Sequence, residues 1–149
     1  LSALKYLKEH EIRGFSVSYE VTHHGPTLDA PVMFVEVGST PEQWQNEEAV
    51  AVVAEAIVAS LKPENADTAV GFGGGHYAPR FSQIALKKNI AFGHMLPRYA
   101  FDFADEEMIR QAVERTVPAP KYYAVHGATD GVLETVERVA EEFGLKRVR

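Results

Sequence analysis

Apolar residues recur along the chain with two different periods, which predict strands and helices in turn. Five short runs are rich in β-branched and aromatic residues, as strands are: residues 15–21, 32–37, 68–72, 90–92 and 122–125. Other segments carry apolar residues at helical spacing: residues 1–10, 42–61, 81–88, 106–116 and 130–143. The order of these segments predicts that strands and helices alternate over most of the chain.

The predicted helix 42–61 has the clearest start. Thr40 can cap its free amides, Pro41 suits its first turn, and Gln43 completes a capping box three residues after the cap. The face expected to be buried is formed by Val50, Val53, Ala54, Ile57, Val58 and Leu61. The last predicted helix, 130–143, carries a similar stripe, and the Gly144 that follows is suited to ending it.

The alternation of strands and helices favours an α/β fold in which helices cover both faces of a mostly parallel sheet. The chain of 149 residues fits one domain, residues 1–149. The first two predicted strands are separated by only about ten residues, which is barely enough for a parallel crossover. They could instead form an antiparallel pair, which would make the sheet mixed.

Composition narrows the class of protein. No apolar stretch approaches the roughly twenty residues needed to cross a bilayer, so we expect a soluble, cytoplasmic protein without a membrane partner. The net charge of −6 argues against a broadly basic nucleic-acid binder. The chain has no cysteine, so any metal would be held by His, Asp and Glu.

Most of the histidines follow predicted strands. These are His23, His24, His76, His94 and His126. Ligands of open α/β sheets bind at the carboxyl ends of the strands, so the sequence predicts a site at this edge.

Two of these histidines are adjacent, in the segment 22–27 (Thr-His-His-Gly-Pro-Thr). Neighbouring residues of a strand point to opposite faces, so His23 and His24 can share a task only if the chain turns between them. Gly25-Pro26 provides a turn. One imidazole would then face a substrate or a metal while the other orients it or contacts a phosphate. The alternative is a pair of structural histidines in a polar turn.

A second unusual segment, 71–81, contains Gly73-Gly74-Gly75 followed by His76. It lacks the ending of a P-loop and the spacing of a dinucleotide fingerprint. Consecutive glycines still allow backbone amides to approach an anion, either a phosphate or the oxyanion of an ester under hydrolysis. Arg80 would add a charged donor. The alternative is a loop whose glycines only permit a sharp turn.

A zinc site built from histidines and a carboxylate is a further expectation. Its candidate ligands are His23, His24, Glu36 and His76, and Glu20 and Glu36 are the nearest acids on predicted strands. No His-Glu-x-x-His or comparable spacing identifies such a site.

Four segments together resemble the D-aminoacyl-tRNA deacylases of the archaeal and plant type: residues 22–27, 35–40, 71–81 and 93–97. They span most of the chain in the family's order. Family members are longer, so the chain resembles their C-terminal, motif-bearing portion. The resemblance implies an α/β fold related to phosphorylases and peptidyl-tRNA hydrolases, zinc as the cofactor, and hydrolysis of the ester between a D-amino acid and the 3′ end of tRNA.

This reaction suggests roles for the candidate residues. One of His23 and His24 would activate or position water, directly or through zinc. His76 and the amides of Gly74 and Gly75 would stabilise the oxyanion that develops on the ester.

The terminal nucleotide would be held by the bend Gly73–Gly75 together with Tyr77, Arg80 and His94. A short contact with the 3′ terminus of the D-aminoacyl-tRNA needs few phosphates neutralised, which suits an acidic chain. Two other classes stay open: a nucleotide- or phosphate-binding module without catalysis, and a nucleoside phosphorylase or metal-dependent amidohydrolase.

Overall fold

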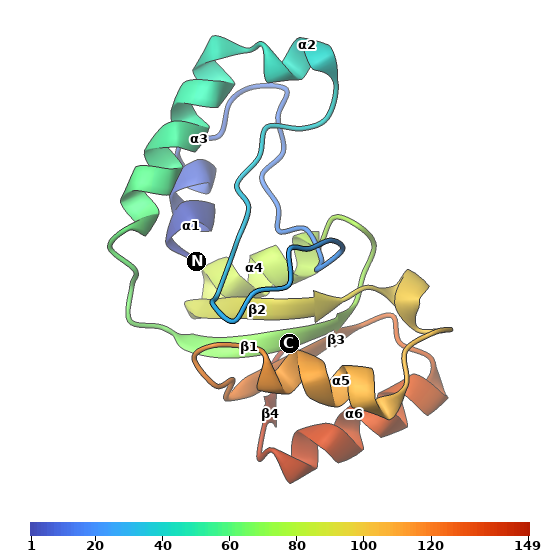
Figure 1. Cartoon of the computed structure of the whole chain (residues 1–149). Helices are drawn as coiled ribbons and strands as arrows, with labels where there is room; N and C mark the ends of the chain where they lie inside the picture. Colours follow the sequence, from blue (N-terminus) through green and yellow to red (C-terminus); the bar gives the residue numbers. More distant parts are fainter.

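Strands and helices alternate along the chain from residue 47 onward, as Figure 1 shows. The structure is a computed structural model that describes all 149 residues. Its elements are α1 (Ser2–Glu9), α2 (Pro41–Trp44), α3 (Glu47–Ser60), β1 (Asp67–Gly73), α4 (Pro79–Lys88), β2 (Ile90–Leu96), the 3-10 helix η1 (Arg98–Ala100), α5 (Glu106–Glu114), β3 (Tyr122–His126), α6 (Asp130–Glu142) and β4 (Lys146–Arg147).

The strands form one parallel sheet in the order β2-β1-β3-β4. All carboxyl ends therefore meet at one edge, where the loops after β1, β2 and β3 begin. The predicted α/β class with a parallel sheet is confirmed.

Helices cover both faces of this sheet. Successive residues of β1 belong to opposite cores: Ala69 packs with the α4 side, and Val70 and Phe72 pack with the α5 and α6 side. In Figure 1, α4 lies on one side of the strands and α5 and α6 lie on the other. β1 is buried almost throughout because it is covered on both faces, as expected of a central parallel strand.

The two strands predicted nearest the N-terminus are wrong. Residues 15–21 form only an isolated antiparallel bridge between Glu20 and Tyr77. Residues 32–37 belong to a longer stretch, 23–39, that makes no backbone–backbone hydrogen bond. The antiparallel alternative is also wrong, because the two segments do not pair with each other. Their sequences favour an extended backbone, but a strand also requires a pairing partner.

The predicted helix 42–61 is divided into α2 and α3. The hydroxyl of Thr40 bonds the side chain of Gln43 and caps no backbone amide, so the predicted capping box is wrong. The cap of α3 is Asn46, whose Oδ1 accepts from the Ala49 N–H at 2.9 Å. The second helix therefore begins at Glu47, after a break that the apolar pattern does not reveal.

The buried face of α3 also differs from the expectation. Ala49 and Ala56 are its buried residues. Of the large side chains expected inside, Val50, Ile57, Val58 and Leu61 are 44–75 % exposed. Small residues face inward because α1 packs directly against α3, and alanines permit a close approach.

The other predicted helices are confirmed as α1, α4, α5 and α6, with bounds shifted by one or two residues. Gly144 follows α6 with a φ of 65°, and its N–H donates to the Glu141 carbonyl at 3.0 Å, which supports its predicted role in ending the helix. None of the helices has both the length and the apolar character that crossing a membrane would require.

Candidate active site

Backbone hydrogen bonds attach the segment 19–22 to the carboxyl edge of the sheet. The Val21 N–H donates to the His76 carbonyl at 3.0 Å, and the Ala78 N–H donates to the Tyr19 carbonyl at 2.8 Å. The Thr22 N–H donates to the Met95 carbonyl, at the end of β2, at 2.9 Å. These bonds bring the first histidine segment against the loop that follows β1.

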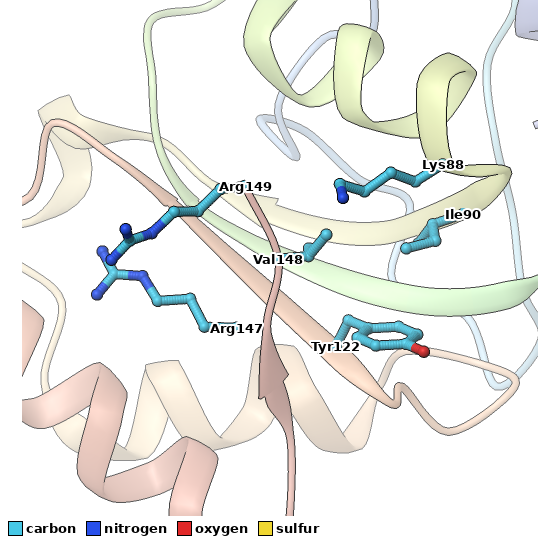
Figure 2. A pocket seen from close by; sticks show the side chains of 6 residues that line it. All are labelled: Lys88, Ile90, Tyr122, Arg147, Val148 and Arg149. Atoms are coloured by element: carbon cyan, nitrogen blue, oxygen red, sulfur yellow. The ribbon is translucent and has the colours of Figure 1, made fainter.

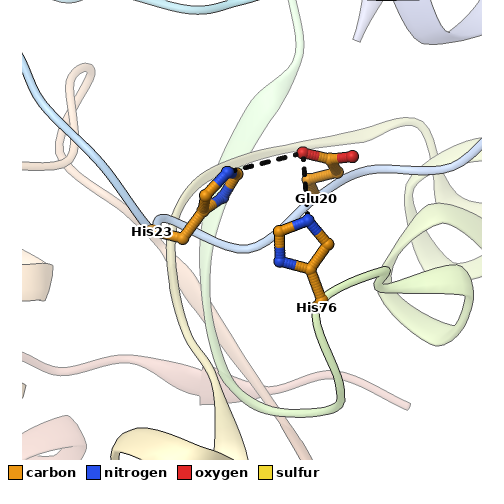
Figure 3. Close-up of side chains that lie close together, drawn as sticks. All are labelled: Glu20, His23 and His76. Atoms are coloured by element: carbon orange, nitrogen blue, oxygen red, sulfur yellow. Dashed lines mark ion pairs between the residues drawn. The ribbon is translucent and has the colours of Figure 1, made fainter. Parts of the chain in front are cut away.

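Glu20, His23 and His76 converge as a result, and we call them the donor cluster (Figure 3). Glu20 Oε2 lies 3.7 Å from His23 Nε2 and 3.6 Å from His76 Nε2. The two imidazole rings are 4.4 Å apart between centroids and inclined at 61°. Two segments more than fifty residues apart in the printed sequence thus contribute to one site.

The backbone fixes the tautomer of His23. Its Nδ1 lies 2.7 Å from the Val21 carbonyl oxygen. A carbonyl only accepts, so Nδ1 carries the hydrogen, and Nε2 of the neutral ring presents a lone pair toward Glu20. A lone pair and a carboxylate oxygen repel each other unless a proton, a water hydrogen or a cation lies between them.

The donor cluster has the residue types that could hold a small divalent metal. Tetrahedral zinc has bonds of about 2.0–2.2 Å to nitrogen and oxygen, so its ligand atoms are about 3.3–3.6 Å apart. The separations from Glu20 are 3.6 and 3.7 Å, and all three donor atoms lie within 4.8 Å of one another. Two histidines and one carboxylate leave a fourth position open, which is the pattern of catalytic zinc sites.

His24 and Glu36 do not belong to the donor cluster. The ring of His24 contacts the edge of His23, with centroids 4.5 Å apart, and packs against Phe34 at 4.6 Å. Its Nδ1 lies 2.5 Å from the Gly25 carbonyl oxygen. Glu36 is exposed on the unpaired segment. The acid that the structure brings to the histidines is Glu20, and the bridge that positions it has no signature in the sequence.

The three glycines form a bend that β3 holds in place. Gly73 and Gly74 have φ angles of 108° and 78°, which favour glycine. A Cβ on Gly73 would lie 2.0 Å from the His126 carbonyl oxygen. The Gly74 N–H donates to that same oxygen at 2.8 Å, so it is not free to bind an oxyanion, contrary to the expectation.

The next two amides, of Gly75 and His76, donate to no group of the chain. Gly75 belongs to the bend and His76 belongs to the donor cluster, so the two amides are part of the loop that joins them. The structure therefore retains two backbone donors for an anion, displaced by one residue from the predicted pair.

The predicted nucleotide-binding residues occupy the same edge. Tyr77 is exposed, and its ring lies 5.2 Å from that of His76 at 81°. Arg80 is exposed in the first turn of α4 and forms no ion pair. His94 lies in β2, and its Nδ1 is 3.2 Å from the Thr22 hydroxyl. Burial, and then the charge of Arg115, lower the pKa of His94. Contact of these residues with a nucleotide stays a prediction.

A separate hollow lies at the opposite edge of the sheet. It has a volume of about 690 Å³ and is lined by Lys88, Ile90, Tyr122, Arg147, Val148 and Arg149 (Figure 2). Ile90 and Tyr122 are the first residues of β2 and β3, so this hollow is remote from the donor cluster.

The family model described as D-aminoacyl-tRNA deacylase matches residues 1–148. A protein of Methanosarcina mazei named D-aminoacyl-tRNA deacylase is 39% identical over 98% of this chain and 49% of its own length. A protein of the same name from Thermococcus kodakarensis is 41% identical over 98% of this chain and 56% of its own length.

A solved structure is also similar, the crystal structure of a conserved protein of unknown function, AF0625. Its TM-score is 0.86 at 34% identity, over 98% of this chain and 52% of that one. The chain thus spans about half the length of the curated relatives that it matches. Because the family model covers almost every residue, the resemblance predicted from the four segments is confirmed, and the chain belongs to the D-aminoacyl-tRNA deacylase family.

Proposed function

We propose that this chain carries the site that hydrolyses the ester bond of D-aminoacyl-tRNA and releases the D-amino acid and free tRNA. The observation that supports this most directly is the convergence of Glu20, His23 and His76 beside two free backbone amides. Ester hydrolysis needs these two components, a group that activates water and donors for the developing oxyanion. Membership of the deacylase family supports the ester of D-aminoacyl-tRNA as the bond that is hydrolysed.

In this mechanism the donor cluster holds the attacking water. The Nε2 lone pair of His23 and the carboxylate of Glu20 both accept hydrogen bonds, so they orient the water, and one of the two groups takes a proton from it as it attacks. The water oxygen bonds to the carbonyl carbon, and the carbonyl oxygen becomes an oxyanion that the N–H groups of Gly75 and His76 stabilise. The ester C–O bond then breaks, and the proton passes to the leaving ribose oxygen.

The same three side chains would hold zinc, with Glu20 replacing the predicted ligand Glu36. Bound there, a zinc ion would lower the pKa of water and polarise the ester carbonyl. His24 would act as a positioning residue, because its ring packs against the edge of His23. We expect the protein to act in the cytoplasm, where aminoacyl-tRNA is used.

Single-turnover deacylation of D-Tyr-tRNA tests the proposal. His23→Ala, His76→Ala and Glu20→Gln should each lower the rate at least tenfold, because each removes one of the groups around the water. His10→Ala is the matched control, since His10 is exposed directly after α1 and stacks on Tyr6. L-Tyr-tRNA should be hydrolysed more slowly than the D-ester by the unaltered protein.

Equal rates on both esters, or full activity in all three variants, would contradict the proposal.

Metal content is tested separately. Chelation should remove one zinc ion per chain and abolish turnover, and added zinc should restore it. Full activity in a sample shown by metal analysis to be metal-free would exclude zinc. The protein groups alone would then carry out the hydrolysis.

A further inference from the structure

The glycine bend is held from two sides by residues with cationic or ionisable side chains. The carbonyl of His126, the last residue of β3, accepts from the Gly74 N–H at 2.8 Å. The N–H of Arg98, the first residue of η1, donates to the Gly74 carbonyl at 3.0 Å. Both contacts use the backbone, so both side chains are left free for another purpose.

These two side chains lie against the bend. His126 Nδ1 is 3.7 Å from the position that a Cβ on Gly74 would occupy. The Arg98 side chain passes over Gly127, where a Cβ would lie 3.8 Å from Arg98 Cδ and 4.0 Å from its Nη1. Any other residue at Gly74 or Gly127 would place its side chain in the space beside His126 and Arg98.

Arg98 has no carboxylate partner. Arg110, Arg115, Arg138 and Arg147 form ion pairs, whereas Arg98 forms none and is exposed. In a chain with a net charge of −6, an arginine without an acid beside it is available to an external anion. A guanidinium suits phosphate in particular, because it donates two parallel hydrogen bonds to two oxygens.

We propose that Arg98 and His126, placed by the glycine bend, bind the phosphate of the terminal nucleotide of the RNA. This inference rests on the proposed function, because it assigns that phosphate to the nucleotide whose ribose carries the ester. Gly74 and His76 are two residues apart, so their Cα atoms are at most about 7 Å from each other, and the phosphate subsite and the donor cluster are built on neighbouring parts of one loop. This short reach suits a single nucleotide, with its 5′-phosphate at the bend and its 3′-ester at the cluster.

A binding measurement tests the subsite without catalysis. The unaltered protein should bind 5′-AMP about tenfold more tightly than adenosine, as one charge-assisted contact allows. Arg98→Ala should remove that difference and leave adenosine binding unchanged, and Arg98→Lys should restore part of it. The bend persists in these variants, because Arg98 holds it through its backbone N–H. Arg13→Ala is the matched control, since Arg13 is also exposed and without an ion pair.

Kinetics with two small esters separates this inference from the proposed function. The unaltered protein should hydrolyse both 3′-O-(D-aminoacyl)adenosine and its 5′-phosphorylated form, 3′-O-(D-aminoacyl)-AMP, in which the ester is on the ribose and the phosphate is free. Arg98→Ala and His126→Ala should raise KM for the AMP ester alone and leave kcat on both unchanged, which a merely structural role would not do. No hydrolysis of either ester, with AMP still preferred over adenosine, would refute the activity and keep the subsite. Equal binding of AMP and adenosine, or equal losses on both esters, would overturn the subsite.

Discussion

At the scale of single residues, the donor cluster depends on one acid, Glu20, that the bridge to Tyr77 brings to His23 and His76. His23 and His76 stand out because their neighbours are glycines and prolines, which favour turns over regular packing. Glu20 has no such neighbours and resembles any acid on a strand. It reaches the histidines through the antiparallel bridge with Tyr77, a contact between distant segments that local sequence does not encode. Glu36, the acid expected to bind the metal, lies outside the donor cluster. Local sequence does not encode this difference between Glu36 and Glu20 either.

Gly73 should be the least replaceable glycine of the bend. In Gly73→Ala, a Cβ would lie 2.0 Å from the His126 carbonyl oxygen, at a φ of 108° that alanine disfavours. Strain of roughly 2 kcal/mol or more should lower the thermal midpoint by at least about 4–8 °C. Thermal unfolding followed by circular dichroism measures this shift.

Gly131→Ala is the control for that variant. Gly131 lies in the first turn of α6, and nothing lies within 4 Å of an added Cβ. An alanine there should leave the midpoint unchanged or raise it slightly. A Gly73→Ala protein as stable as the Gly131→Ala protein would show that the bend moves freely away from β3.

His94 should make stability depend on pH. Burial, followed by the charge of Arg115, lowers the pKa of His94 below its ordinary value of 6.5. The unfolded chain then binds the proton more readily, so the stabilisation is complete above pH 6.5 and is lost as pH falls through the folded pKa. The free energy of unfolding should therefore decrease from pH 7 to pH 5, and by less in His94→Gln.

Urea unfolding at several pH values measures the stability, and NMR titration of the His94 ring measures the pKa directly. Arg115→Gln should move the titration upward, because it removes the second cause of the shift. A His94 ring that titrates at or above 6.5 in the unaltered protein would contradict this account.

At the scale of elements, local pattern predicts α4, α5, α6 and the three main strands, because each of these has both its propensity and a partner. β1 to β3 lie beside one another, and α4 to α6 cover them. The segments 15–21 and 32–37 are also rich in β-branched and aromatic residues, but neither joins the sheet. In the second, Val32, Met33 and Phe34 are 52–58 % exposed. Propensity measures how a residue fits into a sheet and cannot supply the neighbouring strand.

The segment 32–37 should exchange its amide hydrogens rapidly. Its N–H groups make no backbone–backbone hydrogen bond, whereas those of β1 lie in a ladder between β2 and β3. Exchange measured by mass spectrometry should be complete within seconds for 32–37, while residues 69–72 stay protected for hours. Slow exchange in 32–37 at low protein concentration would mean that this segment finds a pairing partner in solution.

At the scale of the whole molecule, cationic side chains lie at both edges of the sheet. The carboxyl edge of the sheet carries the donor cluster with few free cations, Arg98 and Arg80 among them. The opposite edge carries the hollow lined by Lys88, Arg147 and Arg149 (Figure 2). A substrate that contacts only the carboxyl edge neutralises one or two phosphates. A tRNA that also reached the opposite edge would neutralise several more.

Salt dependence distinguishes these two modes of binding. Each phosphate contacted in a single strand contributes about −0.7 to the slope of log affinity against log salt. Contact with the 3′ end alone should therefore give log(kcat/KM) for D-Tyr-tRNA a slope between about −0.7 and −1.4. Arg98→Ala should flatten it, whereas Lys88→Ala should leave it unchanged. A slope steeper than about −3 that Lys88→Ala reduces would mean that the body of the tRNA spans both edges of the sheet, because Lys88 lies in the far hollow with Arg147 and Arg149.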